Sequence, residues 1–459
     1  MFRAYALPHP PIAVPSVGQG QEKKITQTIE ALEQVCNEIA EFAPETIIFI
    51  TPHNVNYLDY FHISPGKSAT GDLWKFNGKW TSCDVKYDYT LASEISYIAE
   101  RAGVRAGFSG EKEAKLDHGV VVPMWFINNV YKNYKAIRIS QSGFDAAEHY
   151  RFGMCISTAV EQTGKKVVLI ASSDLSHKLA VHSAHGYAPE GEMFDNAVLN
   201  ALSSGNFLEL FEIDNGIRER AGECGYRSLM ILAGYFDRLN VEANLLSYEA
   251  PFGVGYAVAS FIAGGINPER DFFEQNEIAS IERVERVRET EDEYRALARM
   301  SLEHKVKTKK PLPMPEDLPE EMLSFAAGVF VSIYKNGALR GCVGTVLPKT
   351  KSVAKEIIQN AVSAGFMDDR FDPVKEPELP HLTYKVDVLS QPEPISSQDM
   401  LDVLRYGVIV ASGHKRGLLL PNLEGVETVN EQIDIACRKA GILPGEKIKL
   451  ERFEVTRYD

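Results

Sequence analysis

Short, almost entirely apolar segments alternate with helix-like segments over the first 265 residues, and this alternation restricts the possible folds most strongly. Segments that are apolar at nearly every position are typical of strands whose two faces are both covered. Helix-like patterns fill the intervals, as at 23–42 and 227–239. The alternation predicts an α/β domain with a central sheet flanked by helices. The expected strands are RAYAL (3–7), ETIIFIT (45–51), YKAIRIS (134–140), KVVLIAS (166–172) and ANLLSYE (243–249).

The pattern changes after residue 268, where a charged stretch begins. Farther along, GVFVSIYKNGALRGCVGTV predicts a β-hairpin, because the Asn336–Gly337 pair suits the positive φ angles of a tight turn. Two more strand-like runs, LTYKVDVLS and YGVIVASGHKRGLLLP, follow before the end of the chain. We therefore expect an α/β domain over 1–268, a charged linker over 269–285 and a differently built α+β domain over 286–459.

Charge and cysteine content exclude several classes of function. The formal net charge of -14 argues against nucleic acid and against anionic membranes as partners. No run of about 18 apolar residues offers a transmembrane helix, and the first residues lack the basic and apolar regions of a secretory signal. The six cysteines are scattered without a CxxC pair, as expected for reduced thiols. These features predict a cytoplasmic protein.

Three histidines are predicted to lie at the carboxyl ends of strands of one sheet. His9 follows the first strand within ALPHPPIAVP, His53 follows the second strand, and His177 follows the strand KVVLIAS. Ligands of open α/β sheets bind at this edge, and neutral imidazoles that converge there are typical of metal sites. We expect His9 and His53 to be metal ligands and His177 to be a base that stays off the metal. Asp174 either orients an imidazole or caps the turn after its strand.

The third metal ligand is open between three side chains. Two histidines and one carboxylate form the arrangement of non-haem Fe(II) oxygenases, which leaves positions for oxygen and substrate. Glu223 would supply that carboxylate, whereas Cys224, as a thiolate, would suit softer metals such as zinc or copper. Both residues precede an expected helix, whose N-terminus favours an anion even without a metal. Glu249, at the end of another strand, is the third candidate.

Several of these residues belong to motifs that resemble a known family. His9, His53 and the motifs LDHG, SSDLSH and GECGYRS together resemble the class III extradiol ring-cleavage dioxygenase B-subunit superfamily, which includes the Memo proteins. The resemblance implies Fe(II) held by His9 and His53, with His118 of LDHG and His177 of SSDLSH as acid–base groups. GECGYRS looks closer to the Memo branch, in which a cysteine, here Cys224, takes the position of the dioxygenase carboxylate.

The second domain resembles the AMMECR-type domain through LRGCVGT, DDRFDPV, KVDVLSQPEPI and YGVIVASGHKRGLLLP. The whole chain therefore resembles the fused form of the AmmeMemoRadiSam system, which implies a radical S-adenosylmethionine protein as a partner. The function implied first is cleavage of a small catechol- or aminophenol-like aromatic substrate by an Fe(II) centre. The alternatives are a metal- and redox-dependent component of a modification system and a non-catalytic Memo-like binding module. A homodimer formed through either domain also fits this organisation.

Overall fold

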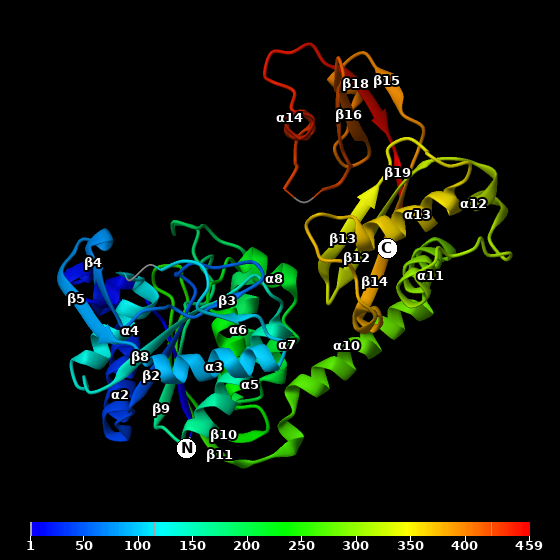
Figure 1. Ribbon diagram of the computed structural model, residues 1–459. Helices are drawn as coiled ribbons and strands as arrows, with labels where there is room; N and C mark the ends of the chain where they lie inside the picture. Colours follow the sequence, from blue (N-terminus) through cyan, green and yellow to red (C-terminus); the bar gives the residue numbers. More distant parts are fainter. Residues whose placement is uncertain (1, 113–114, 424) are drawn as a thin grey trace. The chain divides into compact units, whose positions relative to one another are not determined.

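The computed structural model describes residues 2–112, 115–423 and 425–459. The chain divides into two compact units, residues 1–277 and 278–459. Both are drawn in Figure 1, and each is described by itself.

The centre of the first unit is a six-stranded sheet (Figure 1). Its strands are β1 (Arg3–Leu7), β2 (Thr46–Thr51), β8 (Lys135–Ser140), β9 (Val167–Ser172), β10 (Leu239–Glu249) and β11 (Tyr256–Ile266). They follow the order β10-β11-β1-β9-β2-β8. The strands β1, β9, β2 and β8 run parallel, whereas β11 pairs antiparallel with β1 and with β10. The four parallel strands therefore end along one edge of the sheet.

Helices cover both faces of this sheet, and the side chains of β2 show why. Ile48 and Ile50 belong to the core on one face, whereas Ile47 and Phe49 belong to the core on the other, because successive side chains of a strand point in opposite directions. The first core is covered by α3 (Tyr89–Arg101), α5 (Ala146–Thr163), α6 (Pro189–Ser204) and α9 (Tyr226–Tyr235). The second is covered by α2 (Thr26–Phe42) and α4 (His118–Asn128).

This arrangement confirms the predicted α/β class with a central sheet flanked by helices. All five expected strands form, but β11 and the strands of two small sheets were not predicted. The remaining elements of the first unit are α1 (Pro15–Gly18), β3 (Phe61–His62), β4 (Ser68–Leu73), β5 (Gly78–Lys86), β6 (Ala106–Gly107), β7 (Lys115–Leu116), α7 (Leu208–Phe211) and α8 (Asn215–Ala221).

The second unit contains two four-stranded sheets and is α+β, as predicted. One sheet joins β12 (Gly328–Lys335), β13 (Ala338–Gly344), β14 (Leu382–Leu389) and β19 (Val455–Tyr458). The other joins β15 (Glu393–Ile395), β16 (Gly407–Ser412), β17 (Lys415–Leu419) and β18 (Lys449–Phe453). The expected hairpin is β12–β13, and its turn residues Asn336 and Gly337 have φ angles of 51° and 77°. The helices are α11 (Glu293–Thr308), α12 (Glu320–Ser324), α13 (Val353–Phe366) and α14 (Val429–Ala440).

The segment expected to be a linker, 269–285, is mostly part of helix α10 (Phe272–Glu289), within which the two units divide. Part of its apolar surface is buried: Phe272 belongs to the core of the first unit and Val284 is 5% exposed, whereas Ile278 and Val287 are 53% and 37% exposed. The charged residues of this stretch therefore belong to a helix that is buried in part.

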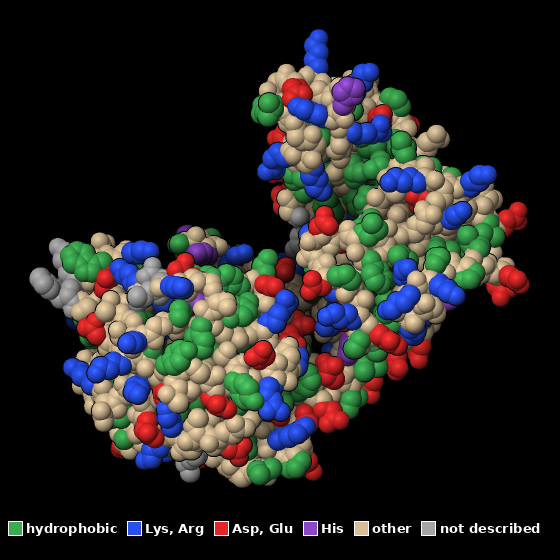
Figure 2. Space-filling view, viewed as in Figure 1, with side chains coloured by type: hydrophobic (Ala, Val, Ile, Leu, Met, Phe, Trp, Pro, Cys, Tyr) green, Lys and Arg blue, Asp and Glu red, His purple; other side chains and the backbone are tan. Residues whose placement is uncertain are grey.

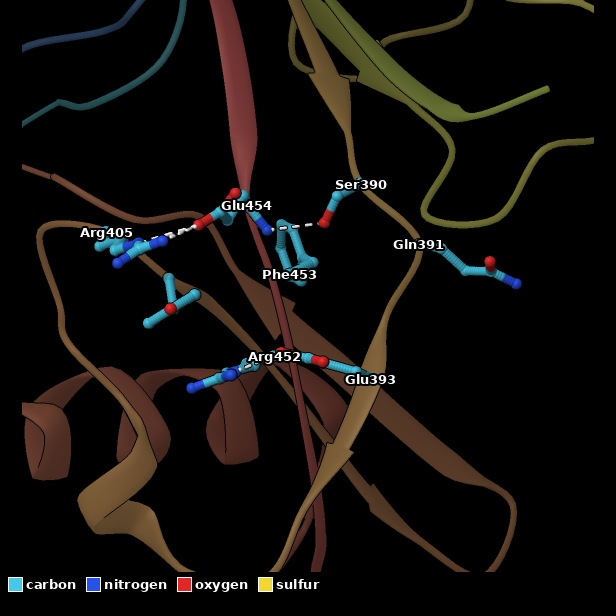
Figure 3. A pocket seen from close by; sticks show the side chains of 8 residues that line it. Ser390, Gln391, Glu393, Arg405, Arg452, Phe453 and Glu454 are labelled. Carbon is cyan, nitrogen blue, oxygen red and sulfur yellow. Dashed lines mark hydrogen bonds and ion pairs between the residues drawn. The ribbon is translucent and has the colours of Figure 1, made fainter. Parts of the chain in front are cut away.

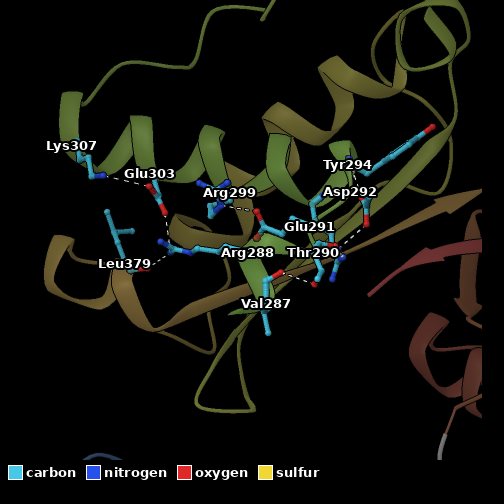
Figure 4. Close-up of polar contacts among 11 residues, drawn as sticks. Val287, Arg288, Thr290, Glu291, Asp292, Tyr294, Arg299, Glu303, Lys307 and Leu379 are labelled. Atoms are coloured by element: carbon cyan, nitrogen blue, oxygen red, sulfur yellow. Dashed lines mark hydrogen bonds and ion pairs between the residues drawn. The ribbon is translucent and has the colours of Figure 1, made fainter. Parts of the chain in front are cut away.

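Ion pairs connect the end of α10 to α11 in the second unit (Figure 4). The Arg299 Nε donates to the Glu291 Oε2 at 2.7 Å, and the Glu291 side chain is only 3% exposed. Arg288 donates from Nη2 to the Glu303 Oε1 at 3.1 Å and to the carbonyl oxygen of Leu379 at 2.8 Å. These contacts hold α10, α11 and the segment before β14 in one arrangement.

On the face shown in Figure 2, acidic and basic side chains are interspersed over both units. Among the described residues, no helix combines the length and the apolar character needed to cross a bilayer.

Candidate metal centre

Three side chains from distant parts of the sequence converge at the edge where the parallel strands of the first unit end. His9 follows β1, His53 follows β2, and Cys224 lies in the turn before α9. One donor atom of each lies within 4.8 Å of the others. The Nε2 atoms of His9 and His53 are 3.0 Å apart, and the Cys224 Sγ lies 3.6 Å from the His9 Nε2. Because β1 and β2 both pair with β9, their ends bring the two histidines together.

These donor atoms fit a transition-metal ion. Ligand distances of about 2.0–2.3 Å place the nitrogen and sulfur donors of a tetrahedral site roughly 3.3–3.7 Å apart. The observed separations of 3.0 Å and 3.6 Å lie close to that range. Two imidazoles and one thiolate are suitable ligands for iron, zinc or copper. His53 is the most exposed of the three residues, so the group is accessible from solvent on that side.

Loss of hydration keeps the imidazoles neutral and the thiol protonated. It lowers the pKa of His9 well below the usual value, with a further contribution from His53. It also lowers the pKa of His53 to about 4, and the nearby His118 lowers it further. Burial raises the pKa of the Cys224 thiol well above its usual value, and nearby carboxylates add to the rise. The histidines are therefore ready to bind a metal, whereas Cys224 needs a cation to become a thiolate.

Asp174 lies against both the backbone and the ring of His9. Its Oδ1 accepts a hydrogen bond from the backbone N–H of His9 at 2.8 Å, and its Oδ2 lies 3.6 Å from the His9 Nε2. The first contact joins the segment after β1 to the segment after β9. Burial raises the pKa of Asp174 to about 7. Asp174 therefore anchors the backbone and also places a carboxyl group beside an imidazole.

The two carboxylates considered as third ligands have other partners. The Glu223 Oε2 accepts a hydrogen bond of 2.7 Å from the backbone N–H of Tyr226, in the first turn of α9. The Glu249 Oε2 accepts hydrogen bonds from the backbone N–H and the hydroxyl of Thr28 in α2, at 2.7 Å and 2.8 Å. Neither carboxylate belongs to the group of donors gathered among the described residues. Of the three candidates, Cys224 is the one that lies beside the two imidazoles.

His118 forms an aromatic wall beside these donors. Its ring stacks on that of His53 with centroids 4.1 Å apart and planes 23° apart, and it lies 5.5 Å from the ring of His9. The ring of Phe76 packs on the ring of His118 at 5.0 Å. Loss of hydration lowers the pKa of His118 to about 4, so its ring is neutral at physiological pH.

His177 lies on the loop after β9, close enough for His53 to influence its charge. Loss of hydration lowers the pKa of His177 to about 4, and His185 and His53 lower it further. The ring of His185 lies 5.3 Å from that of His177. The backbone N–H of the neighbouring Ser176 donates to the Oδ1 of the buried Asp195 at 2.8 Å, which fixes the course of this loop.

Several supporting residues were not predicted from the sequence. The Thr51 hydroxyl donates to the Asp117 Oδ1 at 2.6 Å and accepts a hydrogen bond from the backbone N–H of His53 at 3.2 Å. The Gln141 Nε2 donates to the carbonyl oxygen of Cys224 at 2.9 Å. Thr51 is the last residue of the buried strand β2, and Gln141 follows the buried strand β8. A polar residue at the end of an apolar strand was the sequence signal that could have identified both.

The described part of the second unit contains a thiol beside a pair of opposite charges. The Asp368 carboxylate accepts hydrogen bonds from the backbone N–H of Cys342 at 2.9 Å and from the Arg370 guanidinium at 2.7 Å. The Ser332 hydroxyl donates to the Cys342 Sγ at 3.2 Å. The Arg370 side chain is 58% exposed. Asp368 therefore orders this surface by binding both the strand backbone and the arginine.

A hollow of about 330 Å³ lies where the two sheets of the second unit adjoin (Figure 3). Arg405 donates to Glu454 at 2.8 Å, and Arg452 donates to Glu393 at 2.6 Å. Both guanidiniums also lie over the ring of Tyr406. The charges that line this hollow are therefore paired with one another.

Comparison with known proteins relates both units to described families. The family model described as the catalytic LigB subunit of aromatic ring-opening dioxygenase matches residues 3–259, and the AMMECR1 model matches residues 295–459. A protein of Clostridium acetobutylicum is 41% identical over 99% of this chain and 98% of its own length. A protein of Thermotoga maritima is 46% identical over 34% of this chain and 91% of its own length.

Among solved structures, an uncharacterized protein from Escherichia coli K12 covers 57% of this chain and 100% of its own, with 15% identity and a TM-score of 0.39. The LigB model covers more than half of the chain, and the Clostridium relative matches it almost throughout. The chain therefore belongs to the LigB family of class III extradiol dioxygenase-like proteins, with an AMMECR1 domain fused at its C-terminal side.

Proposed function

We propose that the first unit is a metal-dependent redox enzyme in which His9, His53 and Cys224 hold one transition-metal ion. The observation that supports this proposal is the convergence of three donor atoms within 4.8 Å. They lie at the edge where open α/β sheets bind their ligands. A bound ion would polarise and orient a substrate at its remaining positions.

The neighbouring residues supply proton transfer and a binding surface. We assign proton transfer to His177, whose ring is neutral because its pKa is lowered to about 4; negative charge on a bound substrate would have to raise this pKa for the ring to take a proton from a substrate hydroxyl. The rings of His118 and Phe76, whose planes are 58° apart, offer aromatic surface against which a planar substrate would pack. Asp174, with its pKa raised to about 7, provides a carboxyl group that exchanges a proton near neutral pH.

Cys224 favours a redox component of a modification system over a ring-cleaving enzyme. A thiolate is a softer ligand than a carboxylate and is itself open to oxidation. A centre that contains it is therefore less suited to repeated oxygen chemistry than the carboxylate centre of a ring-cleaving enzyme. We place first a metal- and redox-dependent component of a system that modifies a protein or metabolite. As its partner we propose a radical S-adenosylmethionine protein, as the resemblance of the whole chain to the fused form of the AmmeMemoRadiSam system implies.

Ring cleavage is the second candidate, and two observations favour it. The chain belongs to the LigB family, and the rings of His118 and Phe76 offer aromatic surface to a catechol- or aminophenol-like ring. In this case the ion would be Fe(II), and His118 would contact oxygen or substrate while His177 takes the proton.

Metal content after anaerobic purification tests the proposal. The wild type, His9→Ala, Cys224→Ser and the control Cys437→Ser, a thiol of the second unit, would each be loaded with Fe(II), Zn(II) or Co(II) and desalted. We expect about one ion per chain in the wild type and the control, and loss of the ion in His9→Ala. The Co(II) forms should show a sulfur-to-metal charge-transfer band that is absent only from Cys224→Ser and His9→Ala.

Equal metal content in all four proteins, or none in any, would contradict the proposal, and the latter result would favour a binding module. Oxygen uptake by the Fe(II) protein with a panel of catechols and aminophenols then separates the two enzymatic candidates. Rapid, stoichiometric uptake with ring-opened product would favour ring cleavage, whereas oxidation of Cys224 without product would favour the redox component.

A further inference from the structure

We propose that Ser172 is a positioning residue that fixes the tautomer of His9 and so directs the lone pair of the His9 Nε2 toward the metal. Ser172 ends β9, next to β1, and is fully buried. Its Oγ lies 2.8 Å from the His9 Nδ1 and 2.5 Å from the carbonyl oxygen of Gly119. This inference rests on the proposed function, because it concerns one of the proposed metal ligands.

The positions of the protons follow from these two distances. A carbonyl oxygen only accepts, so the hydrogen of the Ser172 hydroxyl must point to Gly119. The Ser172 Oγ then has only lone pairs left for His9, so the His9 Nδ1 must carry a hydrogen and donate it. A neutral imidazole has one N–H, and the His9 Nε2 is therefore left with a lone pair. In the metal-free protein this lone pair accepts from the His53 Nε2, 3.0 Å away.

His53 differs from His9 in this respect. To bind the same ion, His53 must move its hydrogen from Nε2 to Nδ1, whereas His9 is already in the required form. The hydrogen bond from His9 through Ser172 to Gly119 thus prepares one ligand before the metal arrives. Such outer hydrogen bonds orient metal-binding histidines and are worth about 10- to 100-fold in metal affinity.

The atoms around Gly119 explain why the LDHG motif ends in glycine. A Cβ at this position would lie 2.5 Å from the Thr51 Oγ1, 2.9 Å from the Asp117 Oδ1 and 3.3 Å from the Ser172 Oγ. The space that a side chain would fill is occupied by hydroxyls from the ends of two strands. The motif therefore delivers the His118 ring and, one residue later, a carbonyl oxygen that reaches Ser172.

The tautomer of His9 is measured directly by long-range ¹H–¹⁵N NMR of the full chain labelled at histidine nitrogens, with His9→Gln used for assignment. We expect the Nδ1–H form of His9 in the metal-free wild type, unchanged by Zn(II). Ser172→Ala should show a mixture of tautomers, and Ser172→Thr, which keeps the hydroxyl, should restore the wild-type form. Ser173→Ala is the matched control, because that neighbouring buried hydroxyl donates to the Ala171 carbonyl and does not contact His9.

Zn(II) titration against a competing chelator provides the second readout. Ser172→Ala should bind about 10- to 100-fold more weakly than the wild type, with Ser172→Thr and Ser173→Ala close to wild type and the circular dichroism of all three unchanged. An Nε2–H form of His9 in the wild type, or an unchanged tautomer in Ser172→Ala, would overturn the inference. Failure of the wild type to bind any metal would instead refute the proposed function and leave the NMR result to decide the role of Ser172.

Discussion

Replacement of Asp195 by asparagine is predicted to stabilise the first unit in a way that depends on pH. The Asp195 side chain is buried and accepts hydrogen bonds from the Ser176 N–H at 2.8 Å and the Tyr248 hydroxyl at 2.7 Å. The Asp195 carboxylate has space because residue 255 is glycine: a Cβ at that position would lie 2.1 Å from the Asp195 Oδ2. Burial raises the pKa of Asp195 from 3.8 to about 6. The folded state therefore disfavours the charged carboxylate.

The sign and size of the effect follow from this shift. Because the folded pKa of Asp195 is higher than the unfolded one, its favourable contribution is complete below pH 3.8 and is lost as the pH rises through about 6. The cost to the wild type is about 1 kcal/mol at pH 4.5 and about 3 kcal/mol at pH 7.5. An asparagine side chain at this position carries no charge, accepts from Ser176 through its oxygen, and donates to the Tyr248 oxygen through its amide. Asp195→Asn should therefore gain about 2 kcal/mol relative to the wild type between these pH values.

Differential scanning calorimetry of the full chain at several pH values between 4.5 and 7.5 measures this gain. At pH 7.5 the transition of the first unit, which has 277 residues, should rise by roughly 3–5 °C, and the transition of the second unit serves as an internal reference. The exposed Asp84→Asn is the matched control and should show no such trend. A destabilised Asp195→Asn, or a gain that is the same at every pH, would refute the reasoning.

Three further predictions concern single residues. Gly119→Ala should lower Zn(II) affinity at least as much as loss of the Ser172 hydroxyl, because its Cβ would press on the Thr51 Oγ1 at 2.5 Å; unchanged affinity in a chelator titration would contradict the described packing. Arg299→Met should destabilise the second unit by about 3–5 kcal/mol, because it leaves the buried Glu291 carboxylate without its cation; calorimetry would show little change if that pair were unimportant. Glu249→Gln should leave metal content unchanged, because this carboxylate binds Thr28; loss of metal would make it a ligand after all.

The sequence predicted those parts of the site that depend on strand ends. The sequence placed His9 and His53 at strand ends because each follows an apolar run, and parallel pairing of those runs with β9 brings the two rings together. Spacing alone left the choice between Glu223 and Cys224 open, because adjacent residues in one turn differ only in the direction of their side chains; the resemblance of GECGYRS to the Memo branch pointed to Cys224. Ser172 was also missed, because its role depends on a carbonyl oxygen 53 residues away.

The same reasoning explains the fold. The fully apolar β2 and β9 were predicted because burial on both faces leaves a clear pattern. The strand β11 was missed, because its alanines and glycines give a weak strand signal and its partners β1 and β10 had to be known first. The local sequence pattern thus identified individual strands. The order of the strands in the sheet and the antiparallel strand β11 depend on long-range pairing, which the local pattern does not show.

The wide sequence separation of the three donors has a consequence for the synthesis of the protein. Cys224 follows His9 by 215 residues, and β1 cannot pair with β9 until residues 167–172 have left the ribosome. A nascent chain therefore contains histidines but no metal site for most of the time in which the first unit is made. At the proposed site, metal would be acquired only after this unit has folded, so its occupancy would depend on the metal supply available to the folded sheet.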